Sequence, residues 1–130
     1  VLLDGGSLKL STSENVGSLT INGGELIYGG IINADSFAVD AIGEIKVVFS
    51  AEDLESYNLL IVDFDNLIGD FDESLFVAYD EEGNKLGGEF TKTVYSDYSG
   101  SLTYTVPEPA TFAALLGMAA LFFAARRKSK

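Results

Sequence analysis

Residues 5–10 read GGSLKL and residues 23–28 read GGELIY, two copies of one strand pattern offset by 18 residues. Related glycine-led runs lie between and after them, at residues 17–21 (GSLTI) and 29–32 (GGII). Apolar residues recur at every second position in the longer runs, which is typical of β-strands with one buried face. Glycine pairs beside such strands favour the corners of a β-solenoid, in which each coil stacks its inward Leu or Ile on the next. We therefore expect solenoid-like coils over residues 1–42, with a β-meander as the alternative.

Longer strands with fewer glycines follow this region. They are predicted at residues 44–49, 58–64, 75–80, 85–90, 91–95 and 102–106. A polar, glycine-containing loop between the third and fourth of these strands predicts a hairpin. Ser50 is placed to cap one short helical turn with its hydroxyl group. We therefore predict an antiparallel β region over residues 43–105, and an all-β body.

Charge is divided unevenly along the chain. The net charge is −12, and all 20 acidic residues lie at or before Glu108, whereas four of the eight basic residues follow residue 125. The acidic body repels nucleic acid, so no nucleic-acid partner is predicted. Histidine and cysteine are absent, which excludes Ser-His and Cys-His catalysis and the usual zinc sites. We predict no catalytic residues, no metal and no cofactor, and we expect that the chain is not an enzyme.

The densest acidic cluster begins at Asp63. Asp63 and Asp65 have the one-residue spacing of calcium-loop ligands. Leu67 and Ile68, however, stand where an EF-hand loop needs a ligand and a glycine, so the motif fails. We expect Phe64 to turn inward and both carboxylates to face the solvent.

The C-terminal segment, residues 106–130, breaks the strand pattern. Pro107 and Pro109 lack amide donors, so neither a strand nor a helix should run through them. Residues 110–125 carry no charge and show no polar stripe, and as a helix they would span roughly 24 Å at about 1.5 Å per residue. This predicts one transmembrane helix. By the positive-inside rule, the residues after it act as a stop-transfer cluster on the cytoplasmic side: Arg126, Arg127 and Lys128.

The order of features in this segment resembles the PEP-CTERM sorting signal, also catalogued as the ice-binding protein C-terminal domain. The residues that carry the resemblance are Val106, Pro107, Glu108, Pro109, Ala110 and Thr111, before the apolar helix and the basic end. The resemblance implies processing by exosortase, a membrane-embedded cysteine protease or transpeptidase that recognises the Pro-Glu-Pro motif in Gram-negative bacteria. It implies a transient anchor in the inner membrane and a final place at the cell surface, outer membrane or extracellular matrix. A permanent C-terminal anchor is the alternative.

The body is also similar to autotransporter-like passenger regions. We predict an exported surface or matrix protein with a structural or adhesive role. The first alternative is a module that binds extracellular polysaccharide through Tyr95, Tyr98 and Tyr104 near Asp97, because flat rings can stack on sugar faces. The second is the tail of an enzyme whose catalytic domain precedes Val1. The residues from Val1 to Gly5 have no features of a signal peptide, so we expect the chain to be the C-terminal part of a longer precursor.

Overall fold

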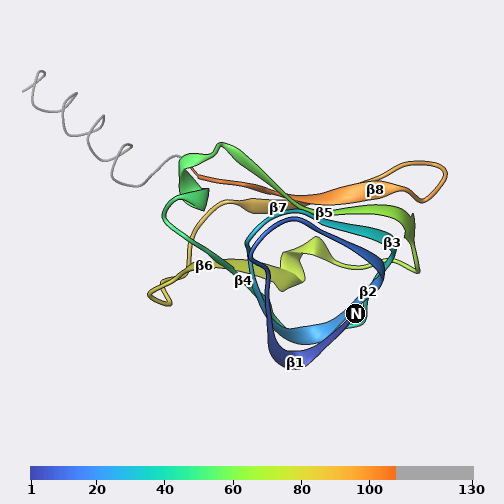
Figure 1. Cartoon of the computed structure of the whole chain (residues 1–130), viewed down its shortest axis with the longest axis horizontal. Coiled ribbons are helices and arrows are strands. Elements are labelled where there is room, and N and C mark those ends of the chain that lie inside the picture. The colour runs from blue at the N-terminus through green and yellow to red at the C-terminus, as the bar shows by residue number, and fades with distance from the viewer. Residues whose placement is uncertain (108–130) are drawn as a thin grey trace, which may run out of the picture.

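The computed structural model describes residues 1–107, which form eight β-strands and two short 3-10 helices around an apolar core (Figure 1). The strands are β1 (Leu2–Lys9), β2 (Glu14–Ile27), β3 (Ile32–Val39), β4 (Ile45–Phe49), β5 (Asn58–Leu67), β6 (Phe76–Asp80), β7 (Glu89–Val94) and β8 (Gly100–Thr105). The 3-10 helices are η1 (Asp53–Glu55) and η2 (Glu73–Leu75). One sheet includes all eight strands, which confirms the prediction of an all-β body. Neither helix in residues 1–107 has the length and hydropathy that a bilayer crossing requires, and the helix predicted at residues 110–125 lies outside the described residues.

Parallel pairing stacks the first strands on one another. β1 pairs with β2, and β2 pairs with β3 and then with β4. Leu8 lies opposite Leu26, and Glu14 lies opposite Ile32, so the register has the same 18-residue offset as the sequence repeat. We call one circuit of the chain around the core a coil. The next coil is longer and continues the stack, since β3 pairs in parallel with β5 and β4 with β6.

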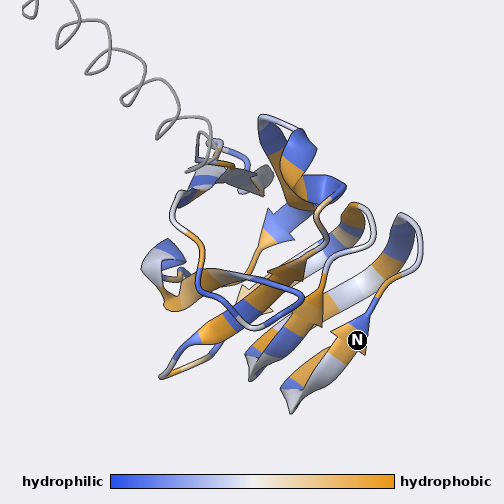
Figure 2. Cartoon of the chain, turned by 90° about the vertical axis from the view of Figure 1, so that its left-hand side faces the viewer, coloured by the Kyte–Doolittle hydropathy of each residue, from blue (hydrophilic) through white to orange (hydrophobic). Residues whose placement is uncertain are grey.

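The core consists of ladders of apolar side chains that run through the stack. One ladder joins Leu8, Leu26, Val47 and Ala78 from four successive coils. Leu26 is 1% exposed and Val47 is fully buried, because each has a ladder neighbour on both sides. Figure 2 shows the alternation along the strands as bands of apolar and polar residues. Burial of such side chains contributes roughly 1.5–3 kcal/mol each, and it is the main force that holds the coils together.

Two glycine pairs form corners where successive coils approach closely. A Cβ atom on Gly24 would lie 2.5 Å from the carbonyl oxygen of Gly6 in the preceding coil. A Cβ atom on Gly30 would lie 2.4 Å from the amide nitrogen of Ser13. A larger residue at either corner would therefore push the coils apart.

The predicted antiparallel region is partly wrong. Antiparallel pairing holds β8 against β5 and β7 against β8, but β4 and β6 pair in parallel. The predicted hairpin after β6 is reduced to one isolated bridge between Tyr79 and Lys85. The Leu86 amide still donates to the Ala78 carbonyl oxygen at 2.8 Å, but the hairpin extends no further because Glu89–Val94 pair with β8 instead. The domain boundaries at residues 42 and 105 stay predictions.

The predicted cap of the helical turn is confirmed. The Asp53 amide donates to Ser50 Oγ at 3.1 Å, and the Ser50 amide donates to Asp53 Oδ2 at 2.9 Å. This reciprocal pair satisfies two amides at the start of η1 and closes the link between β4 and β5.

Candidate functional site

The last described residues, which lead to Pro107, are part of the folded sheet. Thr105 ends β8, where it lies opposite Asn58 of β5 and Glu89 of β7. The Val106 amide donates to the carbonyl oxygen of Tyr57 at 3.0 Å, and the Val106 side chain is 7% exposed. The body therefore holds the chain by backbone and side-chain contacts up to residue 106.

Tyr104 anchors this end of β8 in the core. Its ring stacks on Phe49 at a centroid distance of 4.8 Å and an interplanar angle of 15°, and it packs on Phe90 at 4.8 Å. The hydroxyl group donates to the carbonyl oxygen of Gly87. Burial raises the pKa of Tyr104, so the phenol stays protonated and remains a donor.

Pro107 rests on a glycine pair between β6 and β7. Gly88 has a φ angle of +90°, which favours glycine. A Cβ atom at Gly88 would lie 2.5 Å from the Thr105 carbonyl oxygen and 2.8 Å from Pro107 Cδ, and a Cβ atom at Gly87 would lie 3.9 Å from Pro107 Cγ. The proline ring therefore packs where side chains are missing, and it is half-buried.

A hollow of about 430 Å³ lies beside this contact. Charged and polar side chains at its rim include Asp72, Glu73, Ser74, Lys85 and Glu89, with Tyr104 in the wall. Ser74 Oγ donates to Asp72 Oδ1 at 2.7 Å, and the hydrogen bonds from Ser74 lower the pKa of the Asp72 carboxyl. Asp72 Oδ1 also accepts from the Ser74 amide at 2.9 Å, so this carboxylate caps the start of η2.

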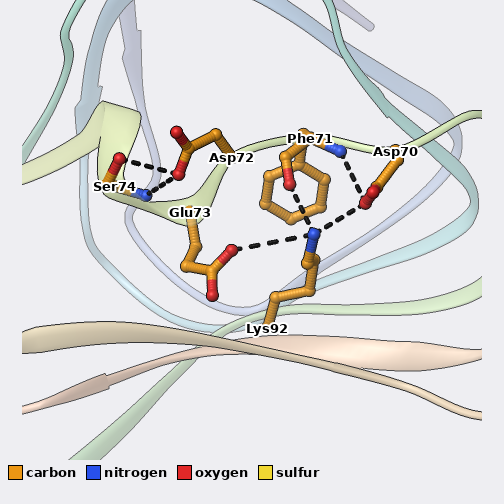
Figure 3. Close-up of polar contacts among 6 residues, drawn as sticks. All are labelled: Asp70, Phe71, Asp72, Glu73, Ser74 and Lys92. Atoms are coloured by element: carbon orange, nitrogen blue, oxygen red, sulfur yellow. Dashed lines mark hydrogen bonds and ion pairs between the residues drawn. The ribbon is translucent and has the colours of Figure 1, made fainter.

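Lys92 of β7 closes the loop that precedes η2 (Figure 3). Its Nζ atom donates to Asp70 Oδ1 at 2.6 Å and to the carbonyl oxygen of Phe71, and it lies 3.7 Å from Glu73 Oε2. It also lies 4.9 Å from the centroid of the Phe71 ring. The hydrogen bond from Lys92 holds the pKa of Asp70 below its ordinary value, and the same bond raises the pKa of Lys92. This cluster ties the η2 side of the hollow to β7.

The acidic cluster around Phe64 has the predicted orientation. Phe64 is 1% exposed while Asp63 and Asp65 are exposed, as predicted. Within residues 1–107 no group of three acidic side chains is arranged to hold a metal ion.

The three tyrosines of the polysaccharide alternative do not form one site. Tyr104 is 1% exposed in the core, so it offers no face to a sugar. Tyr95 and Tyr98 are 63% and 60% exposed at the turn between β7 and β8. This turn is closed by Asp97, whose Oδ1 atom accepts from the Ser99 amide at 3.0 Å.

Of the predicted sorting residues, Val106 and Pro107 lie in the described part of the chain. The others lie outside it: Glu108, Pro109, Ala110, Thr111, Arg126, Arg127 and Lys128. A family model described as "PEP-CTERM protein-sorting motif" matches residues 105–128. The chain carries a PEP-CTERM sorting motif. No curated protein and no solved structure matches the chain.

The PEP-CTERM motif implies an exported bacterial protein that is sorted by exosortase to the cell surface. The matched range begins at Thr105, so its first three residues belong to the folded body. The residues that hold this junction are Tyr57, Gly87 and Gly88, none of which the sequence pattern singles out. The glycine pair lies within the strand predicted at residues 85–90, where the structure has a loop instead.

Proposed function

We propose that this protein is a structural or adhesive component of the surface or extracellular matrix of a Gram-negative bacterium, released from a transient membrane anchor by exosortase. The match of residues 105–128 to the sorting motif supports this proposal most strongly. The body supports a structural role, because its coils stack in parallel as in a β-solenoid and extended stacks of this kind make stalks and binding surfaces. The proposal includes the transmembrane helix at residues 110–125 and the cytoplasmic basic cluster that follows it.

Processing can be tested in a host with a functional exosortase. Mass spectrometry of surface material should find C-terminal peptides that end near Pro107, and none from residues 112–125. Changing Pro109 to Ala should leave an uncleaved form in the membrane fraction, and it leaves the described body unchanged because Pro109 lies beyond it. Ser101→Ala, on β8 but before the matched residues, is the matched control and should be processed normally. Recovery of the intact tail from mature wild-type protein would show a permanent anchor instead.

A second candidate function is polysaccharide binding. The exposed rings of Tyr95 and Tyr98 favour it, because both lie on one short turn and can stack on sugar faces. Tyr98→Ala should then weaken retention in gels that contain the host's exopolysaccharide. Tyr57→Ala removes a ring that is even more exposed, at 73%, but lies outside this turn, and it should not change retention. Equal retention of all three proteins would remove this candidate.

A further inference from the structure

The start of the sorting motif is held inside the folded body. The matched range begins at Thr105, the last residue of β8, and β8 lies between β5 and β7 in the sheet (Figure 1). Thr105 therefore has a strand partner on both sides, Asn58 of β5 and Glu89 of β7. Strands inside a sheet open less readily than frayed chain ends do, so the motif starts at a firmly held position.

The next two residues are also covered by the body. Val106 is 7% exposed and belongs to the apolar core, and its amide donates to the Tyr57 carbonyl oxygen at 3.0 Å. Pro107 is half-buried, and its Cγ atom lies 3.9 Å from a Cβ atom built on Gly87. An enzyme that binds this part of the chain in a cleft needs the surface that these contacts cover.

The sequence leaves little room between the body and the proposed membrane anchor. Glu108 and Pro109 alone separate Pro107 from the segment proposed as a transmembrane helix, residues 110–125. The three residue steps from Pro107 to Ala110 span at most about 11 Å, even when the chain is fully extended. In the anchored form the body therefore lies close to the membrane while Pro107 stays in place, and the processing enzyme has to reach the motif between the two.

We propose that the body masks its own sorting motif, and that exosortase acts on a locally opened form in which Val106 and Pro107 have left the body. This inference rests on the proposed processing by exosortase. When opening and closing are fast, an enzyme that needs the open form works at a rate set by the population of that form. The contacts of Val106 and Pro107 with the body then set how fast the protein is released from the membrane.

A pulse-chase experiment with the full chain, in a host with a functional exosortase, measures the rate at which the tail is lost. Gly88→Ala leaves the motif unchanged, but its Cβ atom would lie 2.5 Å from the Thr105 carbonyl oxygen and 2.8 Å from Pro107 Cδ. It should therefore push the start of the motif off the body and raise the processing rate by about tenfold, since one buried Val side chain and one hydrogen bond hold the closed form.

Gly83→Ala is the matched control. Gly83 has a φ angle of +87°, close to the +90° of Gly88, so both substitutions strain the backbone in the same way. A Cβ atom built on Gly83, however, meets nothing within 4 Å. Gly83→Ala should therefore be processed at the wild-type rate.

Two further variants separate local opening from loss of overall stability. A Gly-Ser-Gly-Ser linker between Thr105 and Val106 keeps residues 106–111 together and detaches them from the body, so it should raise the rate even if Gly88→Ala fails to fold. Leu26→Ala weakens the core on β2, which β3 and β5 separate from β8 in the sheet, and it should leave the rate near that of the wild type. Hydrogen exchange of the purified chain should be faster at the Val106 amide in Gly88→Ala, with the β2 amides unchanged.

The outcomes distinguish this inference from the proposed function. If the linker variant and Gly88→Ala are processed no faster than the wild type, the inference falls and the proposed function stands. The same holds if Gly83→Ala or Leu26→Ala raises the rate as much as Gly88→Ala, because processing would then follow backbone strain or unfolding of the whole body. If neither the wild type nor any variant loses its tail, the proposed function falls, and this inference falls with it.

Discussion

Leu26→Ala and Leu8→Ala each shorten a side chain in the apolar ladder that joins Leu8, Leu26 and Val47. The two changes should lower the free energy of unfolding by unequal amounts. Leu26 is 1% exposed and lies between Leu8 and Val47, so its truncation leaves a cavity that neighbours on both sides cannot fill. Buried Leu→Ala changes cost about 2–5 kcal/mol, and we expect about 3 kcal/mol here. Leu8 is half-buried and has a ladder neighbour on one side among the described strands, so we expect about 1 kcal/mol.

Urea unfolding of the full chain in mild detergent, followed by far-ultraviolet circular dichroism, measures both losses. With a slope of about 2 kcal/mol per molar urea, Leu26→Ala should lower the midpoint by roughly 1.5 M, and Leu8→Ala by roughly 0.5 M. The slope itself should stay constant, because neither change alters the surface that unfolding exposes by much. Equal losses, or a larger loss at Leu8, would refute the assignment of Leu26 to the interior of the stack.

Three further outcomes follow from the contacts near β7 and β8. Lys92→Met should lower the urea midpoint more than Asp70→Asn, because Lys92 also donates to the Phe71 carbonyl oxygen, whereas Asp70 is largely exposed. The pKa of Asp70 is held below its ordinary value of 3.8, so its contribution is present above pH 3.8 and disappears as the pH falls through the lowered value. The wild-type midpoint should therefore fall more steeply than that of Asp70→Asn between about pH 4 and pH 2. Tyr104→Phe should cost about 1 kcal/mol in urea unfolding, because the Gly87 carbonyl oxygen loses its donor while the ring contacts stay; no loss would contradict this bond.

The sequence predicted features that depend on short-range periodicity. The offset between the two glycine-pair copies gave the register of β1 on β2, because each coil there has the repeat's length. Alternation predicted that Phe64 is buried between exposed carboxylates. The hydroxyl of Ser50 capped η1 as expected from its position before an acidic turn. In each case the responsible residues lie within one coil or one strand.

Partner choice between distant strands was not predictable in the same way. The apolar run of β6 marks a strand, but it carries no information on which strands pair with its two edges. In the structure β4 pairs along one edge, where Val47 lies opposite Ala78, and the following segment contributes only the bridge between Tyr79 and Lys85. The contact of Pro107 with Gly88 is also long-range, since it needs β7 and β8 to be paired.

The two ends of the stack differ physically, and this difference gives the molecule a direction. After the last coil, β8 pairs with β5 in antiparallel fashion, so the parallel stacking ends at β5. The match to the sorting motif begins at Thr105, the last residue of β8, and continues through Val106, whose amide is bound to the Tyr57 carbonyl oxygen. At the other end, β1 pairs with β2 in parallel, and Leu8 is half-buried. The parallel coils therefore lie on one side of β5, and the antiparallel strands that lead to the sorting motif lie on the other side.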